Sequence, residues 1–262
     1  MTIYLDSANI EHIKEIMHLQ LATGITTNPS ILLKSGVRRD ELDSTYSDIM
    51  KLTRGDVSVE LLNFEVSEDE LLAEAREYGV KHHTCFTDMK LVIKVPFVYP
   101  KGVSLIAKMK ELGIPVNATC IMSAHQAILA IQQKPRYISF FYNRMKDYAD
   151  AKYEEIAALE KTELNGKSDE DEDESFEYET VYASDIEEEV LQEIALTRRY
   201  IDINDLNTQI ICGSIREIYD IQKCLDYGAH IVTVPYKILI GMLNHPKTDE
   251  AVDEFTAAAL KL

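Results

Sequence analysis

The chain has 262 residues, of which 46% are hydrophobic, and a formal net charge of −18 at pH 7. A chain of this length buries one sizeable core, and a single α/β domain of this size is ordinary. The charge argues against binding to nucleic acid or to an anionic membrane through a broad basic face, but it leaves room for a local basic pocket.

The sequence shows no targeting, membrane-spanning or metal-binding pattern. Residues 1–6 lack the basic and apolar regions of a signal peptide, and no apolar run approaches the length of a membrane span. The cysteines, at positions 85, 120, 212 and 224, include no Cys-x-x-Cys pair, which is typical of reduced thiols in a cytoplasmic protein. The adjacent His82 and His83 point in different directions, so we interpret them as a solvated turn and predict no metal site.

Short apolar runs alternate with amphipathic stretches along the chain. The runs predict strands at Ile3–Leu5, Ala22–Thr26, Val57–Leu61, Leu91–Val95, Val116–Thr119, Tyr137–Phe140, Gln209–Cys212 and Ile231–Val234. The amphipathic stretches predict helices that include Ile10–Leu19, Glu68–Tyr78, Val103–Glu111, Ala124–Gln132, Ile186–Tyr200 and Ile215–Leu225. Ser67 with Glu70, and Ser184 with Glu187, have the spacing of capping boxes and so mark two helix starts.

Eight strands, each followed by a helix or loop, imply a right-handed parallel arrangement. Within 262 residues the economical solution is a closed (β/α)8 barrel, which we predict as a single α/β domain over residues 1–262. A doubly wound open sheet is the alternative fold, although no glycine-rich dinucleotide turn follows the first strand.

One segment, residues 163–180, breaks this alternation. It contains the run Ser168-Asp-Glu-Asp-Glu-Asp-Glu-Ser175 and almost no aliphatic residues. Such a run repels itself and buries no core, so we predict a solvated, disordered insert after the sixth strand. A lid over the barrel, or a docking segment for a basic partner, is the functional alternative.

The strand predicted at Leu91–Val95 contains a lysine. Branched apolar residues lead up to Lys94, and Pro96 then ends the strand because proline cannot donate to a ladder. A continuous apolar run is typical of a strand buried on both faces. Burial disfavours an ammonium group, and a neutral amine attacks a ketone to form a Schiff base. The alternative is a lysine whose side chain reaches out of the strand end into solvent.

Candidate site residues follow the other predicted strands at their carboxyl ends, where a barrel of this kind places its chemistry. They are Asp6, Asn28, Glu60, Asn117, Thr119, Ser139, Phe141, Arg144, Ser214 and Arg216. Each has a structural interpretation, such as a helix cap, a turn, an ion pair or a surface arginine. Their common location around Lys94 favours the functional interpretation.

Six motifs, taken in order, resemble those of the transaldolase family, which also contains fructose-6-phosphate aldolases. They are Tyr4-Leu-Asp6, Gly24-Ile-Thr-Thr-Asn-Pro-Ser30, Ile93-Lys-Val-Pro96, Gly113-Ile-Pro-Val-Asn-Ala-Thr119, Phe141-Tyr-Asn-Arg144 and Gly213-Ser-Ile-Arg216. The resemblance covers almost the whole chain apart from the acidic insert. It implies the same barrel fold and aldol chemistry through a lysine Schiff base, with no metal or organic cofactor.

The resemblance implies catalytic roles for four residues. Lys94 corresponds to the lysine that forms the Schiff base. Asp6 corresponds to the carboxylate that hydrogen-bonds the donor substrate and assists proton transfer at the cleaved bond. Glu60 and Thr119 correspond to the pair that positions a catalytic water, and a glutamate is a suitable general base for imine formation.

The resemblance also implies how the substrate binds. Asn28 corresponds to an amide that holds a donor hydroxyl, and Ser139 to a residue at the hydroxymethyl end of the donor. Arg144, Ser214 and Arg216 correspond to the phosphate site. Two planar guanidinium groups and a hydroxyl suit a phosphate dianion.

At two positions the chain resembles the transaldolases of the family more than the aldolases. The aldolases typically carry a glutamine at the third strand and a tyrosine three residues before the sixth-strand arginine, where this chain has Glu60 and Phe141. Phe141 has no hydroxyl to activate a water beside the imine. The resemblance therefore implies transfer of dihydroxyacetone from fructose 6-phosphate or sedoheptulose 7-phosphate to an aldose phosphate, in the non-oxidative pentose phosphate pathway.

Two other functions stay open at this stage. One is a fructose-6-phosphate aldolase that releases free dihydroxyacetone. The other is a non-catalytic barrel that binds sugar phosphates or docks a partner through the acidic insert. We expect sugar-phosphate ligands, no nucleic-acid or membrane partner, and a homo-oligomer in the cytoplasm.

Overall fold

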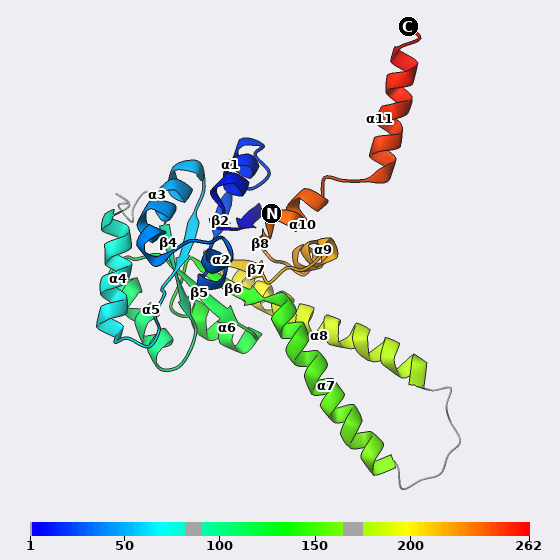
Figure 1. Ribbon diagram of the computed structural model, residues 1–262. Coiled ribbons are helices and arrows are strands. Elements are labelled where there is room, and N and C mark those ends of the chain that lie inside the picture. Colours follow the sequence, from blue (N-terminus) through cyan, green and yellow to red (C-terminus); the bar gives the residue numbers. More distant parts are fainter. Residues whose placement is uncertain (1, 82–90, 165–174) are drawn as a thin grey trace.

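The structure is a computed structural model that describes residues 2–81, 91–164 and 175–262. The strands described there form one closed parallel barrel in chain order (Figure 1). They are β1 (Thr2–Asp6), β2 (Gly24–Thr26), β3 (Val57–Glu60), β4 (Leu91–Pro96), β5 (Val116–Ile121), β6 (Tyr137–Phe141), β7 (Gln209–Gly213) and β8 (Ile231–Val234). The predicted (β/α)8 barrel is confirmed, and the doubly wound sheet is excluded.

Helices surround the barrel and connect its strands (Figure 1). They are α1 (Ile10–His18), α2 (Pro29–Lys34), α3 (Leu42–Leu52), α4 (Glu68–Lys81), α5 (Lys101–Glu111), α6 (Ala124–Ile131), α7 (Tyr142–Leu164), α8 (Ser175–Ile203), α9 (Ile218–Asp226), α10 (Tyr236–Gly241) and α11 (Pro246–Ala259). The predicted helices correspond to α1, α4, α5, α6, α8 and α9. The sequence prediction contains no α2 because its start, Asn28-Pro29-Ser30, has the composition of a turn.

One predicted helix start is confirmed and the other is wrong. The backbone N–H and the hydroxyl of Ser67 donate to Glu70 Oε2 at 3.0 and 2.6 Å. In contrast, the predicted start at Ser184 lies inside α8, which runs without a break from Ser175 to Ile203. Glu187, the other half of that expected capping box, instead accepts hydrogen bonds from α7 and α9. Its tertiary contacts override the local capping pattern.

Helices occupy the outer parts of the acidic insert predicted over residues 163–180. α7 ends at Leu164 and α8 begins at Ser175. The acidic centre of the insert, residues 165–174, lies outside the described residues, as do His82, His83 and Cys85. α7 and α8 extend beyond the barrel on the same side (Figure 1).

The alternation of side chains along β4 positions the predicted nucleophile. Leu91, Ile93 and Val95 are almost fully buried and belong to the main apolar core. The alternate residues Val92 and Lys94 therefore face the barrel interior. Val92 packs in a small cluster near the amino ends of the strands, and Lys94 lies one layer further toward the carboxyl ends.

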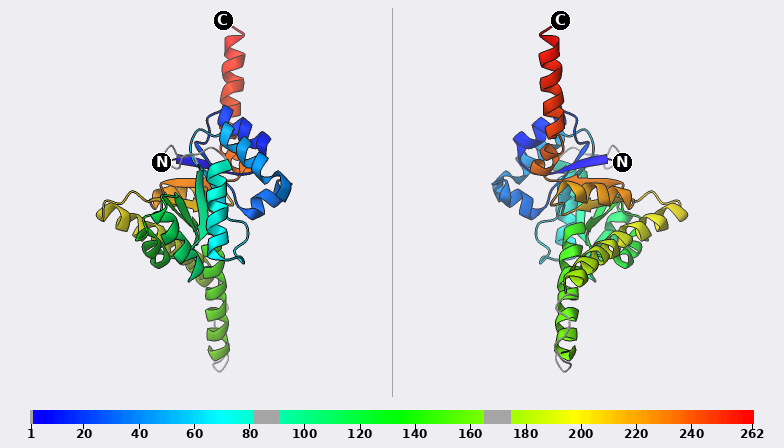
Figure 2. Two further views of the ribbon diagram at one scale, coloured as in Figure 1. Left: turned by 90° about the vertical axis from the view of Figure 1, so that its left-hand side faces the viewer. Right: turned by 90° about the vertical axis from the view of Figure 1, so that its right-hand side faces the viewer.

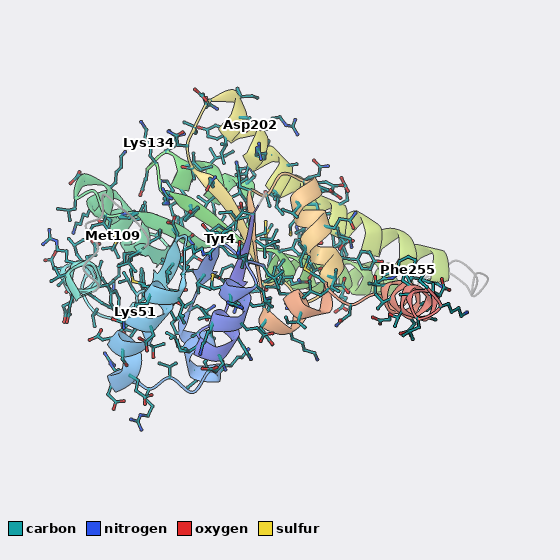
Figure 3. All side chains as sticks on the ribbon, turned by 90° about the horizontal axis from the view of Figure 1, so that it is seen from above. Tyr4, Lys51, Met109, Lys134, Asp202 and Phe255 are labelled. Carbon is teal, nitrogen blue, oxygen red and sulfur yellow. The ribbon has the colours of Figure 1, made fainter. Side chains whose placement is uncertain are left out.

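A polar and aromatic cluster, here called the base cluster, closes the amino-terminal end of the barrel. Tyr137 donates to Asp56 Oδ2 at 2.6 Å, and Arg136 Nε donates to the same oxygen at 2.5 Å. The hydroxyl of Tyr4 lies 3.1 Å from that of Tyr137, and Figure 3 shows Tyr4 among the strands. A Cβ atom on Gly24 would lie 2.5 Å from the Tyr4 ring, so only glycine at this position leaves space for that ring.

The last helix, α11, extends away from the barrel, in the direction opposite to α7 (Figure 2). It has no buried residue. Val252 and Phe255 are 55% and 72% exposed, and Phe255 lies far from the strands in Figure 3. Over residues 2–81, 91–164 and 175–262, no helix is both long enough and apolar enough to cross a membrane.

Candidate active site

A pocket of about 400 Å³ opens at the carboxyl ends of the strands. The residues of the predicted site that line it are Asp6, Asn28, Glu60, Lys94, Ser139, Phe141, Arg144 and Ser214. Thr119 and Arg216 are not among the lining residues. The barrel thus brings most of the predicted site together at one mouth, as parallel strands require of residues at their carboxyl ends.

Lys94 is buried inside this mouth, with 4% of its surface exposed. Its Nζ donates to the carbonyl oxygen of Thr27 at 3.1 Å and lies 3.3 Å from Glu60 Oε2. The strand register places Glu60 directly beside Lys94, on the neighbouring strand β3. The amine therefore does not reach solvent, and a carboxylate lies close enough to exchange protons with it, directly or through one water.

Two threonines orient Asp6 at the end of β1. Thr26 Oγ1 donates to Asp6 Oδ1 at 2.6 Å, and the hydroxyl of Thr233 makes a short hydrogen bond with Thr26 Oγ1. Because Thr26 has one hydroxyl proton, Thr233 donates to Thr26 when Thr26 donates to Asp6. Burial raises the pKa of Asp6, while the charge of Lys94 and the Thr26 hydrogen bond oppose that rise. A raised pKa suits a carboxyl group that takes and returns a proton.

Two buried oxygens on the strands that flank β4 have no nitrogen or oxygen hydrogen-bond partner among the described residues. They are Glu60 Oε2 on β3 and Thr119 Oγ1 on β5. Glu60 Oε2 is within ion-pair distance of Lys94 but does not form a hydrogen bond with it. Buried polar atoms in proteins nearly always have partners. Unsatisfied oxygens on both neighbours of the lysine strand therefore suit a small polar ligand, such as a water or a substrate hydroxyl.

A chain of hydrogen bonds crosses the barrel interior beside Lys94. Ser139 Oγ donates to Asn117 Oδ1 at 2.7 Å, and Asn117 Nδ2 donates to Ser58 Oγ at 3.3 Å. This chain fixes the Ser139 hydroxyl with its oxygen free to accept. Asn28 caps α2 by accepting from the backbone N–H of Ile31 at 2.9 Å. The cap uses the amide oxygen and keeps the amide N–H groups as donors for a ligand.

A local group of cations borders the pocket, although the chain carries a net charge of −18. The guanidinium carbon of Arg144 lies 5.1 Å from the centre of the Phe141 ring, a cation–π contact that orients the arginine. Ser214 has a φ of 62°, and its carbonyl oxygen accepts from Asn143 Nδ2 at 2.8 Å. Lys34 on α2 also lines the pocket. This arrangement suits an anionic ligand.

Arg216 lies just outside the pocket, where its guanidinium group is engaged by a carboxylate. Its Nη1 and Nη2 donate to the two oxygens of Asp147 at 2.6 and 2.5 Å. The Arg216 side chain is 55% exposed. The hydrogen bond from Arg216 lowers the pKa of Asp147. The predicted phosphate site is thus only partly assembled, since Arg144 and Ser214 line the pocket and Arg216 does not.

Further polar lining residues, to which the sequence analysis gave no role, include Thr26, Lys34, Cys120 and Thr233. Thr26 and Thr233 are hydroxyl residues within otherwise apolar strands, and that pattern was a usable signal. Cys120 reaches the pocket because the register of β5 shifts between Ala118 and Ile121 and Cys120 adopts a φ of 60°. No sequence pattern marks such a shift.

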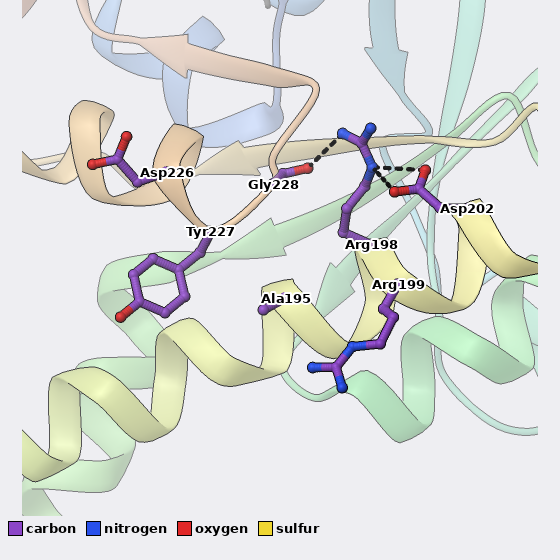
Figure 4. Close-up of a pocket in the computed structure, with 7 residues that line it drawn as sticks. All are labelled: Ala195, Arg198, Arg199, Asp202, Asp226, Tyr227 and Gly228. Atoms are coloured by element: carbon purple, nitrogen blue, oxygen red, sulfur yellow. Dashed lines mark hydrogen bonds and ion pairs between the residues drawn. The ribbon is translucent and has the colours of Figure 1, made fainter.

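A second hollow, of about 390 Å³, lies between α8 and the loop after α9 (Figure 4). Arg198 Nε donates to both oxygens of Asp202, at 2.9 and 2.8 Å, and its Nη1 donates to the carbonyl oxygen of Gly228 at 3.2 Å. None of the predicted site residues lines this hollow. The guanidinium group of Arg198 is already hydrogen-bonded to Asp202 and to Gly228, and the predicted site residues lie elsewhere. We therefore take the barrel mouth as the candidate active site.

Comparisons with known proteins match nearly the whole chain. Residues 3–262 match the family described as transaldolase/fructose-6-phosphate aldolase. A probable transaldolase from Cytophaga hutchinsonii is 28% identical over 258 residues, which cover 98% of this chain and 97% of the relative. A probable transaldolase 1 from Listeria monocytogenes is 29% identical over 260 residues, with the same coverage of 98% and 97%.

Solved structures are similar in fold alone. The dihydrodipicolinate synthase from Rhodopseudomonas palustris has a TM-score of 0.52 at 10% identity, over 89% of this chain and 69% of that one. The thiamine phosphate pyrophosphorylase from Pyrococcus furiosus has a TM-score of 0.50 at 11% identity, over 91% and 87%. The family match spans residues 3–262, nearly the whole sequence. The chain therefore belongs to the transaldolase/fructose-6-phosphate aldolase family.

Proposed function

We propose that this protein transfers a dihydroxyacetone unit from a ketose phosphate to an aldose phosphate through a Schiff base on Lys94. The observation that carries the proposal is the environment of Lys94, a buried amine 3.3 Å from Glu60 Oε2 in a pocket that Asp6 also lines. A protonated imine supplies the electron sink that cleavage of a carbon–carbon bond requires.

The first half of the reaction forms the imine. Glu60 takes a proton from the Lys94 ammonium group, and the free amine attacks C2 of the ketose. Glu60 gives that proton to the carbonyl oxygen, which yields a carbinolamine with a protonated nitrogen. Glu60, acting through a water that Thr119 also contacts, takes the proton from nitrogen and returns one to the departing hydroxyl. Water leaves, and the donor is held as a protonated imine. The unsatisfied oxygens of Glu60 and Thr119 support this assignment.

The second half breaks the bond between C3 and C4. Asp6 takes the proton of the C4 hydroxyl, C4 becomes the aldehyde of the departing aldose phosphate, and the electron pair of the bond moves into the imine to give an enamine. The enamine then attacks the aldehyde of an incoming aldose phosphate, and the steps run in reverse. The raised pKa of Asp6 supports its role as the group that carries this proton.

Phe141 in the pocket favours transfer over release of dihydroxyacetone. Release needs a water that attacks the imine before an acceptor arrives. Phe141 offers no hydroxyl to activate such a water, and its ring packs against Arg144 instead. The likeness to proteins described as probable transaldolases also supports transfer. We take fructose 6-phosphate or sedoheptulose 7-phosphate as donor, with a place in the non-oxidative pentose phosphate pathway.

The cysteines and the last helix, α11, support a proposal for the compartment and the oligomeric state of the enzyme. The described cysteines, Cys120, Cys212 and Cys224, are free thiols, which supports a reducing compartment, and we place the protein in the cytoplasm. The exposed apolar side chains of α11, including Val252 and Phe255, support a homo-oligomer that covers this helix. Light scattering on the full chain and on a Phe255→Asp variant tests the assembly.

The central experiment compares two reactions of fructose 6-phosphate. We expect rapid formation of sedoheptulose 7-phosphate when erythrose 4-phosphate is present and little free dihydroxyacetone when it is absent. Borohydride added with the donor should reduce the imine and attach a dihydroxyacetone-derived mass to Lys94 alone. Release of dihydroxyacetone without an acceptor that is as fast as transfer with one would identify an aldolase. An absence of any adduct would identify a barrel that binds without catalysis.

A further inference from the structure

The phosphate site holds an internal carboxylate that occupies one of its arginines. Asp147, on the second turn of α7, accepts hydrogen bonds from Arg216 Nη1 and Nη2 at 2.6 and 2.5 Å. A phosphate group would use the same two donors, because a bidentate carboxylate and a bidentate phosphate present their oxygens to arginine in the same geometry. Asp147 therefore stands where a phosphate oxygen pair would bind this side chain.

The main chain around Arg216 is fixed, so only the side chain is free to exchange partners. The backbone N–H groups of Arg216 and Glu217 donate to Asp220 Oδ2 at 2.8 and 3.1 Å. Asp220 is fully buried, and the same oxygen accepts from Asn143 Nδ2 at 2.6 Å. These bonds tie the loop after β7 to the start of α7. The Arg216–Asp147 pair, in contrast, is exposed at 55% and 52% of its two side chains.

An exposed ion pair contributes little net stability and is screened by salt. A phosphate dianion carries twice the charge of a carboxylate, and in this pocket it would also contact Arg144 and Ser214. Asp147 lies within electrostatic range of Arg144 as well as Arg216, and both cations lower its pKa. It therefore remains an ionised competitor at every pH at which the sugar phosphate is a dianion.

We propose that Asp147 competes with the substrate phosphate for Arg216 and thereby sets the affinity of the pocket for phosphorylated sugars. The inference rests on the proposed function, which assigns the substrate phosphate to this end of the pocket. Substrate binding then includes a swing of Arg216 from Asp147 to the phosphate. Release of the aldose phosphate product is helped because Asp147 recaptures the arginine.

The test measures the Michaelis constant for erythrose 4-phosphate and for unphosphorylated erythrose. Asp147→Ala should lower the constant for erythrose 4-phosphate about two- to five-fold, the range expected for one exposed ion pair, and leave that for erythrose unchanged. The matched control is Asp150→Asn, which removes the same charge from the same helix one turn further on. An equal effect of both variants would reduce the proposal to general repulsion by the acidic chain, and would overturn it.

A double variant and a binding measurement separate this proposal from the proposed function. In Arg216→Ala, the further change Asp147→Ala should give no gain, because the contested side chain is gone. Calorimetry with inorganic phosphate alone should show tighter binding to Asp147→Ala than to the wild type, whether or not the enzyme turns over. Unchanged phosphate affinity overturns the competition while borohydride trapping on Lys94 with dihydroxyacetone still stands. If borohydride trapping were lost while phosphate affinity improved, the proposed function would fail and the competition for Arg216 would stand.

Discussion

The two ends of the barrel use the same kinds of polar residue in opposite ways. At the amino-terminal end, the base cluster pairs its groups with one another, since Asp56 accepts from both Tyr137 and Arg136, and Tyr137 contacts Tyr4. At the carboxyl end, Glu60 and Thr119 each keep a buried oxygen without a nitrogen or oxygen hydrogen-bond partner among the described residues. Both ends are built from short loops and strand termini of one sheet.

This is the difference expected between polar groups that stabilise a fold and polar groups that bind a ligand. A satisfied polar cluster stabilises one arrangement of the strands and offers nothing to a ligand. An unsatisfied group in a buried position costs free energy, and it persists where a ligand completes its contacts. Changes at the mouth should therefore alter turnover more than folding, and changes at the base should do the opposite.

The largest expected effect is that of Lys94→Met at the mouth. Methionine matches the length and apolar character of the lysine stem but cannot form an imine, so turnover should fall by at least about 1,000-fold. The fold should survive, but the temperature of thermal unfolding should fall, because Glu60 Oε2 loses the cationic partner that lies 3.3 Å away. Activity is measured by transfer to erythrose 4-phosphate. Residual turnover near the wild-type level, or an adduct on Lys90 or Lys108 in the wild type, would contradict the assignment.

A smaller effect, with a pH signature, is expected for Thr26→Val. The hydrogen bond from Thr26 lowers the pKa of Asp6 against the larger rise caused by burial. Removing it raises the pKa of Asp6 further, so the ionised carboxylate that accepts the C4 proton is lost at a higher pH. The acid limb of kcat/KM should move to higher pH, with a loss of about ten-fold at neutral pH. Thr26→Ser keeps the donor and serves as the control.

Phe141→Tyr should sharpen the distinction between transfer and release. The added hydroxyl lies at the pocket wall and can activate a water beside the imine. Release of free dihydroxyacetone from fructose 6-phosphate should rise about two- to ten-fold while transfer falls, because each imine is hydrolysed more often. Phe141→Leu, which adds no hydroxyl, should not increase release. The same increase in both variants would point to altered packing under Arg144 instead of water activation.

The sequence contains enough information to predict the barrel and most of its mouth. Lys94 interrupts an apolar strand, and the order of strands alone brings Asp6, Glu60 and Ser139 to the same end. Side-chain partners are less predictable. Arg216 bonds to Asp147 instead of facing the pocket, and nothing in the local sequence decides between these two anionic partners.

The missed features share a physical cause, which is that they depend on tertiary contacts. Cys120 enters the pocket through a register shift in β5, and a shift of one residue exchanges the faces of a strand without altering its apolar pattern. The expected helix start at Ser184 failed for a related reason. Glu187 is used by α7 and α9, and this contact becomes visible only once the helices are packed together.

The smallest effect on activity, and the clearest test of the comparison, comes from Tyr137→Phe in the base cluster. The change removes one donor to Asp56 and the partner of the Tyr4 hydroxyl, and it leaves the ring volume almost unchanged. A lost hydrogen bond to a buried carboxylate should lower the free energy of unfolding by about 1–3 kcal/mol. Tyr236→Phe, which removes the exposed hydroxyl that donates to Glu15, should cost less than about 0.5 kcal/mol.

The base cluster lies at the amino-terminal end of the barrel, and the pocket lies at the carboxyl ends of the strands, beyond Val92. The kcat and KM of Tyr137→Phe should therefore stay at the wild-type values. A loss of turnover without a loss of stability would mean that the base of the barrel is coupled to Lys94, and the division into a structural and a functional end would then fail.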